Sequence, residues 1–341
     1  MQRILIRMPN WLGDGVMASP VFEVLKSQYP KADFVFVGPK VVCDLYRQDS
    51  RVKEFFIDTT KQESKGGKSR LWATYKLAKK IGQCDLAITF TNHIFSALLL
   101  YFSGSIRRVG FGGFLRNLLL TDTLKAGKKE HQVLTYARLL EPLGFGFSLG
   151  GLKLPIASAQ RESGISVGIS TGAAFGASKI WPKEYFVQVV AHLLQEGYRV
   201  LLFGSGEEAK NNHAITQEVA QMIPSKNLGL LEDWSNKTSI EDLVSKIAAV
   251  DVFLGHDSGP THIAAAMQIP LVALFGATHP TYCLPWKHDK NIVINKHLPC
   301  APCQKKTCPL KHHECMRQIT PQEVITALTK LLKDKYESRF F

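Results

Sequence analysis

The sequence predicts an α/β protein made of two doubly wound parallel sheets, one in residues 1–155 and one in residues 156–341. Three observations indicate this class. Short β-rich runs alternate with helical stretches along the chain, which is typical of parallel sheets covered by helices. The alternation stops near residue 155 in a stretch without clear period and then begins again. A length of 341 residues with 45% apolar content also favours two cores of ordinary size.

In the first half, the runs "RILIRM", "DFVFVGP", "VKEFFID" and "CDLAITF" predict strands at 3–8, 33–39, 52–58 and 84–90. Helices are expected between them at 19–29 and 71–81. The apolar run "HIFSALLLYFSGS" is too short for a membrane span, which needs ~20 residues, so we expect a buried helix there. The segment "KQESKGGKSR" at 61–70 is expected to be a flexible cationic loop.

The second half repeats the pattern. Its strands are expected at 165–171, 198–204, 227–233, 251–257 and 270–276, from "ISVGIST", "YRVLLFG", "NLGLLED", "DVFLGHD" and "PLVALFG". Ligands of open α/β sheets bind at the carboxyl ends of the strands, so the residues that follow these runs are the candidates for a site.

The charge is concentrated in the first half. Of the net charge of +13, residues 1–155 carry +11, from 23 Lys and Arg against 12 Asp and Glu, and residues 156–341 carry +2. A positive field on one half favours a polyanionic partner, although a solubilising surface is the alternative. No export signal or membrane span is expected, and we therefore predict a cytoplasmic protein with reduced cysteines.

Polar residues stand where the predicted strand 251–257 runs into a helix. They are His256, Asp257, Ser258, Gly259, Pro260, Thr261 and His262. Proline is favoured in a first helical turn, and the free N–H groups of that turn suit a phosphate. The alternative is that Asp257 and Ser258 only cap the helix.

Two glycine-containing loops follow neighbouring strands. "STGAAFGASKIWP" leads into Lys179, which can supply a point charge to a diphosphate, although the P-loop spacing is absent. "FGSGEEA", with Gly204 and Gly206, has the spacing of a dinucleotide fingerprint but follows the second strand of its domain. An NAD(P)-binding oxidoreductase is therefore kept as an alternative.

Five ordered segments resemble the bacterial lipopolysaccharide heptosyltransferases: "PNWLGDGVMASP", "GAAFGASKIWP", "LLFGSGEE", "HDSGPTHIAAA" and "CAPCQKKTCPLKHHECMRQITPQEV". The likeness is closest to the members that add the second heptose of the inner core. It implies the GT-B architecture, two facing Rossmann-like domains with an inter-domain cleft, the acceptor on residues 1–155 and the donor on 156–341. It also implies inverting transfer from ADP-heptose (ADP-L-glycero-D-manno-heptose), with no cofactor required for catalysis.

The same resemblance implies that Asp14 is the catalytic base, which takes the proton of the attacking acceptor hydroxyl. Between Gly13 and Gly15, we expect Asp14 in a tight loop over the cleft; a turn carboxylate without function is the alternative. A diphosphate leaves without a proton, so anion stabilisation should suffice. The donor contacts expected are Lys179, Thr238, Asp257, Ser258, Gly259, Thr261 and His262.

For the acceptor, the candidates are Arg116, Arg107 and Arg108 in "RRVGFGGFLRN". Arg116 matches an acceptor-side arginine of the family, and a guanidinium suits the carboxylates and phosphates of the Kdo and heptose core. The alternative for Arg107 and Arg108 is that they solubilise a strand edge.

Four cysteines near the end of the chain have the spacing of a structural zinc site, with free thiols as the alternative. They are Cys300, Cys303, Cys308 and Cys315.

The resemblance implies two partners, ADP-heptose and the heptosyl-Kdo inner core of lipopolysaccharide on Kdo-lipid A, and no nucleic acid. We also expect reversible, peripheral contact with the anionic cytoplasmic face of the inner membrane. The residues expected to make it are Lys61, Lys65, Lys68, Arg70 and Trp72. Other functions left open are heptose transfer at a neighbouring inner-core position and a non-enzymatic polyanion-binding protein.

Overall fold

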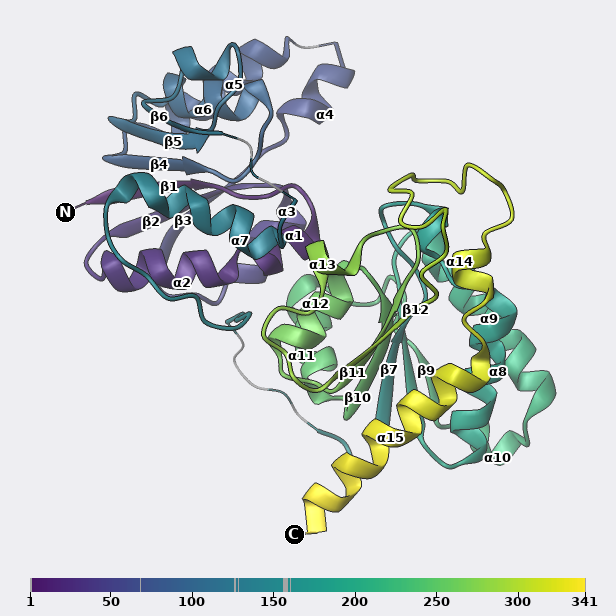
Figure 1. The fold of residues 1–341 in the computed structure, drawn as a ribbon. Coiled ribbons are helices and arrows are strands. Elements are labelled where there is room, and N and C mark those ends of the chain that lie inside the picture. The colour runs from purple at the N-terminus through teal and green to yellow at the C-terminus, as the bar shows by residue number, and fades with distance from the viewer. Residues whose placement is uncertain are drawn as a thin grey trace. The chain divides into compact units, whose positions relative to one another are not determined.

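The computed structural model describes residues 2–67, 69–125, 127, 129–155, 159 and 161–340. The chain divides into two compact units, 1–155 and 156–341. Each unit contains a six-stranded parallel sheet with helices on both faces (Figure 1). The strand orders are β3-β2-β1-β4-β5-β6 and β12-β11-β10-β7-β8-β9. Counted within each unit, both are the order of doubly wound nucleotide-binding sheets, so the predicted α/β class with two parallel sheets is confirmed.

The first unit contains β1 (Arg3–Arg7), α1 (Leu12–Met17), α2 (Ser19–Gln28), β2 (Asp33–Gly38), α3 (Lys40–Cys43), β3 (Val52–Ile57), α4 (Thr60–Lys65), α5 (Arg70–Ile81), β4 (Leu86–Thr89), α6 (Ile94–Phe102), β5 (Arg107–Phe111), β6 (Asp122–Leu124) and α7 (Gln132–Ala137). Short 3-10 turns lie at Asp44–Tyr46, Arg116–Leu118 and Arg138–Leu143.

The second unit contains β7 (Ser166–Ser170), a 3-10 turn at Ala177–Lys179, α8 (Lys183–Gln195), β8 (Arg199–Phe203), α9 (Glu207–Met222), α10 (Ser225–Leu228), β9 (Leu231–Asp233), α11 (Ile240–Ala249), β10 (Val252–His256), α12 (Gly259–Ala266), β11 (Leu271–Phe275), α13 (Pro280–Cys283), β12 (Asn291–Asn295), α14 (Glu314–Arg317) and α15 (Pro321–Phe340).

Two segments differ from the sequence-based expectation. The predicted strand 227–233 is shorter, because its first residues belong to α10 and to the turn after it. The predicted loop 61–70 begins as helix α4. Asp58 Oδ1 accepts hydrogen bonds from Thr60 N at 3.1 Å and Thr60 Oγ1 at 2.6 Å, and so stabilises the start of that helix.

The first sheet is covered on both faces, so its strands read as nearly continuous apolar runs. On one face, Leu5, Val35 and Val37 pack against buried residues of α5 and α6. On the other, Phe22 of α2 contacts Phe36 and Phe90, with ring centroids 5.2 and 5.0 Å apart. Successive apolar side chains of one strand therefore point to opposite faces of the sheet and pack into two separate cores.

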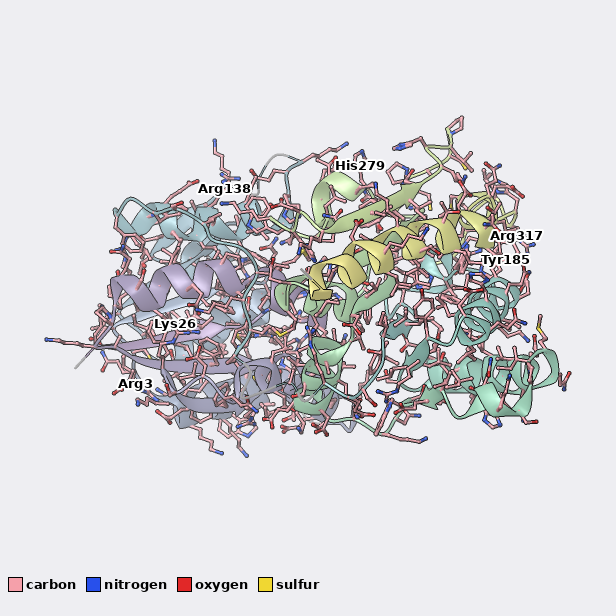
Figure 2. The ribbon with its side chains drawn as sticks, turned by 90° about the horizontal axis from the view of Figure 1, so that it is seen from below. Arg3, Lys26, Arg138, Tyr185, His279 and Arg317 are labelled. Atoms are coloured by element: carbon pink, nitrogen blue, oxygen red, sulfur yellow. The ribbon has the colours of Figure 1, made fainter. Side chains whose placement is uncertain are left out.

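One charged pair is also buried in the first unit. Lys26 of α2, labelled in Figure 2, forms an ion pair with Asp49. Burial lowers the pKa of Lys26, although the Asp49 carboxylate opposes that shift. The pair fastens α2 to the segment before β3.

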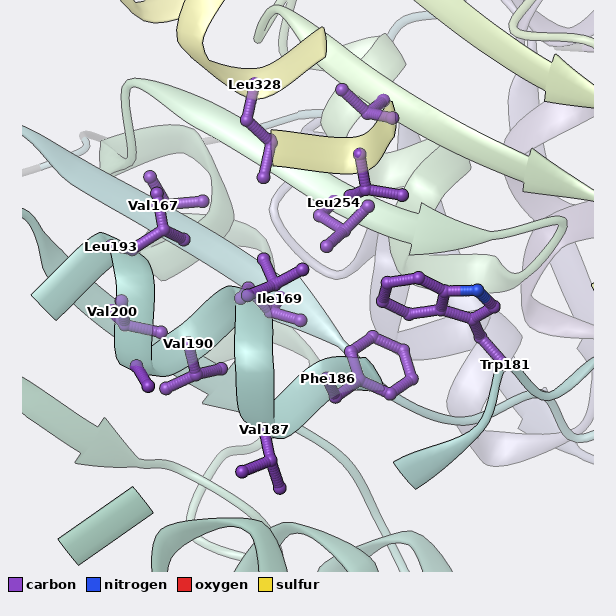
Figure 3. Close-up of a cluster of buried hydrophobic side chains, with 14 of the residues drawn as sticks. Val167, Ile169, Trp181, Phe186, Val187, Val190, Leu193, Val200, Leu254 and Leu328 are labelled. Atoms are coloured by element: carbon purple, nitrogen blue, oxygen red, sulfur yellow. The ribbon is translucent and has the colours of Figure 1, made fainter. Parts of the chain in front are cut away.

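A core of the second unit lies under α8 and α15 (Figure 3). Trp181 and Phe186 meet edge to face, with centroids 5.0 Å apart, beside Ile169 and Leu254. Trp181 Nε1 donates to Ile319 O at 2.9 Å, so this large side chain also satisfies its polar atom. In the described part of the chain, no helix is long and apolar enough to cross a membrane.

Candidate active site

Asp14 lies beyond the carboxyl end of β1, in the first turn of α1. The prediction of a glycine loop is therefore corrected: the GDG segment is helical, and a first-turn acid is favoured by the positive end of a helix. Packing explains Gly15. A Cβ there would lie 2.7 Å from Val42 Cγ1, so the glycine lets α1 approach α3.

Two aromatic residues surround this turn. The Tyr46 hydroxyl donates to Gly15 O at 2.8 Å. Burial raises the pKa of the Tyr136 phenol in α7, and the charge of Asp14 adds to that shift. Asp14 itself is half-buried, so part of its side chain remains accessible at the start of α1.

A buried arginine stabilises the loop before Asp14. Arg7 ends β1 and is 6% exposed. Its Nη2 donates to Asn10 Oδ1 at 2.9 Å and to Asp58 Oδ2 at 3.0 Å. Burial lowers the pKa of Arg7 and the Asp58 charge opposes this. The sequence analysis missed Arg7, although a charged residue at the end of an apolar strand was a usable signal.

Arg116 lies at the same edge of the first sheet and is 5% exposed. Its guanidinium donates to Phe111 O at 2.7 Å, to His93 O at 2.5 Å and to Ser96 Oγ at 3.0 Å. These acceptors are all uncharged, and its buried Nη2 has no hydrogen-bond partner among the described residues. Burial lowers the pKa of Arg116 to about 10.

Arg107 and Arg108 are placed differently, at the amino end of β5. Arg107 Nη2 lies 2.8 Å from Asp122 Oδ1. Arg108 Nε donates to Leu119 O at 2.7 Å. Ligands of such sheets bind at the opposite, carboxyl edge, so these contacts favour the structural alternative for both residues.

In the second unit, Asp257 follows the carboxyl end of β10 and contacts residues of the β7–α8 connection, of the loop after β11 and of α12. Its Oδ2 lies 2.5 Å from Lys179 Nζ and accepts from Thr278 Oγ1 at 2.8 Å, and its Oδ1 lies 3.5 Å from His262 Nε2. Burial alone would raise the pKa of Asp257, but His262 and Lys179 outweigh it and hold that pKa below its usual range. We call Lys179, Asp257, His262 and Thr278 the Asp257 cluster.

The beginning of α12 adds backbone donors to this edge of the sheet. Gly259 is its first residue, and Ser258 is the N-cap but makes no side-chain capping hydrogen bond, so capping alone does not explain it. Thr261 Oγ1 donates to His256 O at 2.5 Å. Thr238 lies just before α11, which begins with a capping box formed by Ser239 and Asp242.

A loop of the late cysteine segment packs against the loop that carries Lys179. Ser178 N donates to Lys306 O at 3.0 Å, and His313 Nε2 lies 2.9 Å from Ser178 O. Gly176 has φ +150°, and a Cβ there would collide with the Lys306 backbone. The sequence analysis missed this support and Thr278; the signal for Thr278 was its place just after β11.

Comparison with known proteins shows the family of the chain. Residues 74–314 match glycosyltransferase family 9 (heptosyltransferase). The chain belongs to this family. It is 33% identical to lipooligosaccharide heptosyltransferase 2 of Campylobacter jejuni, over 98% of this chain and 99% of that protein. The predicted family is thus confirmed, and the chain is a glycosyltransferase.

Solved structures of the family agree over the full length. The structure of E. coli ADP-heptose lps heptosyltransferase II has a TM-score of 0.81 and 26% identity, covering 98% of this chain and 100% of that one. E. coli heptosyltransferase WaaC with ADP has a TM-score of 0.75 at 16% identity, covering 97% and 100%, and shows the shared fold.

The glycosyltransferase fold gives the oxidoreductase alternative no support. The structure of the "FGSGEEA" loop gives it none either. A Cβ on Gly172 would collide with the Glu208 carboxylate, which also accepts from Ser205 N at 2.9 Å. The chain's own acid therefore fills the space beside Gly204, where a dinucleotide phosphate would be repelled.

The zinc prediction receives no support from this structure. Cys300, Cys303, Cys308 and Cys315 are free, and no group of His, Cys, Asp or Glu among the described residues is arranged to hold a metal ion. Burial raises the pKa of the Cys315 thiol to about 11, and the neighbouring cysteines add to that shift.

His256, the last residue of β10, is a buried residue that contacts the segment between β7 and α8. Its Nε2 accepts from Trp181 N at 2.9 Å, and its Nδ1 lies 3.4 Å from Gly172 O. Burial lowers the pKa of His256 to about 4. The side chain is 0% exposed, and it joins β10 to both ends of the segment that connects β7 with α8.

This shift predicts a pH-dependent stability. Between the unfolded pKa of 6.5 and the folded value of about 4, the unfolded chain binds more protons, so the free energy of unfolding should fall as pH drops through that window. The loss is at most about 3 kcal/mol. Urea unfolding at several pH values measures it. His256→Gln should flatten the dependence, whereas His213→Gln, at an exposed position, should not; equal slopes would refute the assignment.

Proposed function

We propose that the chain transfers L-glycero-D-manno-heptose from ADP-heptose to the heptosyl-Kdo inner core of lipopolysaccharide, as the second heptose. The observation that carries the substrate assignment is the full-length similarity to heptosyltransferase 2 enzymes. The positions of Asp14 and of the Asp257 cluster support it, because each lies at the carboxyl edge of a doubly wound sheet, where ligands bind.

In the proposed mechanism, the first unit binds the acceptor and the second unit binds the donor. Asp14 takes the proton of the acceptor hydroxyl as its oxygen attacks the anomeric carbon from the side opposite the diphosphate. The bond to the ADP oxygen breaks with inversion. Arg116 has buried donor capacity without an acid partner, which suits an anionic group of the acceptor.

The diphosphate would be held by Lys179 and by the first N–H groups of α12, from Gly259 and Thr261, since Pro260 has none. Asp257 orients Lys179 and a hydroxyl of the donor. Ser258, His262 and the backbone at Thr238 complete the proposed donor contacts. Arg107 and Arg108 are not part of this site, because their guanidinium groups contact the amino edge of the sheet.

ADP release measures this function directly. With heptosylated Kdo-lipid A as acceptor, ADP-heptose should support release and UDP- and GDP-sugars should not. Transfer to Kdo-lipid A that lacks the first heptose would instead favour a neighbouring inner-core position. Absence of release with every acceptor would contradict the proposal, and a bound nicotinamide absorbance would favour the oxidoreductase.

A further inference from the structure

Helix α5 is strongly basic on its exposed side. It exposes Lys76, Lys79 and Lys80, and the helix contains no acid. Between residues 64 and 121 the chain contains nine Lys and Arg against one acid, Asp85. The Asp85 carboxylate accepts from Arg3 N at 2.7 Å, so it is already engaged in a hydrogen bond.

Aromatic rings interleave with these cations. Trp72, 55% exposed, stacks on Tyr75 with centroids 5.4 Å apart and 12° between the planes. Lys76 Nζ lies 5.3 Å from the Trp72 ring and Lys79 Nζ 5.5 Å from the Tyr75 ring. Interfacial helices combine aromatic and basic side chains in this way.

The same pattern continues onto α6, which packs beside α5 on the same side of the sheet (Figure 1). Tyr75 meets Phe102 at 5.5 Å and Phe102 meets Tyr101 at 5.9 Å. Tyr101 is 49% exposed, and Arg108 lies 5.6 Å from its ring. The α5–α6 stripe is defined here as Trp72, Tyr75, Lys76, Lys79, Lys80 and Tyr101.

The stripe shares one residue with the membrane contact expected from the sequence. The Arg70 guanidinium lies 4.0 Å from the Phe95 ring and its Nε is buried, so it is turned inward. Lys61 and Lys65 belong to α4. Lys68 lies outside the described residues. Of the five residues expected at the membrane, Trp72 is the one within the stripe.

We propose that the α5–α6 stripe is the surface through which the protein lies on an anionic lipid bilayer. The Trp and Tyr rings would sit at the level of the headgroups, and the lysines would bind lipid phosphates while their stems cover apolar surface. Nucleic acid fits less well, because the Trp72 ring already contacts Tyr75 and Lys76 and is no free platform for stacked bases. The inference rests on the proposed function, whose acceptor is a lipid.

Vesicle co-sedimentation of the full chain tests the stripe, using phosphatidylcholine with and without phosphatidylglycerol. Each lysine near an anionic surface is worth about fivefold in affinity, so Lys76→Gln/Lys79→Gln/Lys80→Gln should bind anionic vesicles roughly a hundredfold more weakly. Trp72→Ser should weaken the binding that persists at high salt. The control Lys210→Gln/Lys226→Gln/Lys290→Gln removes the same charge from exposed positions of the second unit and should bind normally.

ADP release on delipidated core oligosaccharide separates this inference from the proposed function. Every variant should keep wild-type release there, whereas the stripe triple variant should lose activity on vesicle-embedded acceptor. The membrane role of the stripe would be refuted if the triple variant bound vesicles as tightly as the wild type, or if the control variant lost as much binding. Equally tight binding of the wild type to a single-stranded RNA would also refute it. Absence of release by the wild type on both acceptors would refute the transferase assignment instead.

Discussion

Replacing Asp14 with Asn is expected to lower kcat by about two to four orders of magnitude, the usual contribution of a general base. The acceptor hydroxyl would then attack without a group to take its proton. The donor would still bind, so the dissociation constant of ADP should stay nearly unchanged. Single-turnover transfer and ADP calorimetry measure the two quantities separately.

A structural explanation predicts a much smaller effect. As a first-turn acid of α1, Asp14 contributes about 0.3–1 kcal/mol to stability through the helix dipole. The expected loss of rate corresponds to about 3–5 kcal/mol of activation free energy. Asp33→Asn, which makes the same change at the start of β2, should keep full activity. A rate above one tenth of wild type in Asp14→Asn would exclude the base role.

The two sheets could be predicted from sequence because each β-rich run is local and repeats with helices between. The strands that were missed carry a weaker signal. β5 begins with two arginines and contains Gly110, and all residues of β12 are only partly buried. Both strands are held by their neighbours in the sheet: β5 pairs with β4 and β6, and the edge strand β12 pairs with β11. Their pairing partners lie outside any local window of sequence.

The sequence could predict which loops meet at the candidate site, because parallel strands bring their carboxyl ends to one edge of the sheet. The contacts within it were not predictable. Lys179 and Asp257 are far apart in sequence, and their ion pair depends on the rotamers that the packed loops allow. His256 could be read as a motif residue, but its neutral state follows from complete burial. The close approach of Gly15 in α1 to Val42 of α3 likewise joins residues that are far apart in sequence.

Lys179→Met is expected to lower kcat/KM for the donor by about two to three orders of magnitude, as the loss of one stabilising group for a developing anion does. The side chain keeps its length but loses the cation next to the proposed diphosphate. The affinity for ADP should fall more than tenfold. Lys183→Met is the matched control, because that lysine pairs with Glu218 at a half-exposed position of the same unit.

The ion pair complicates this variant, because Asp257 would keep a buried charge without its cation. Such a loss costs about 3–5 kcal/mol of stability, here reduced by the hydrogen bond from Thr278 and by His262. The double variant Lys179→Met/Asp257→Asn removes both charges and should recover much of the free energy of unfolding. If Lys179 binds the diphosphate, transfer stays low in that double variant although the fold is restored. Recovery of ADP affinity together with stability would show instead that Lys179 only neutralises Asp257.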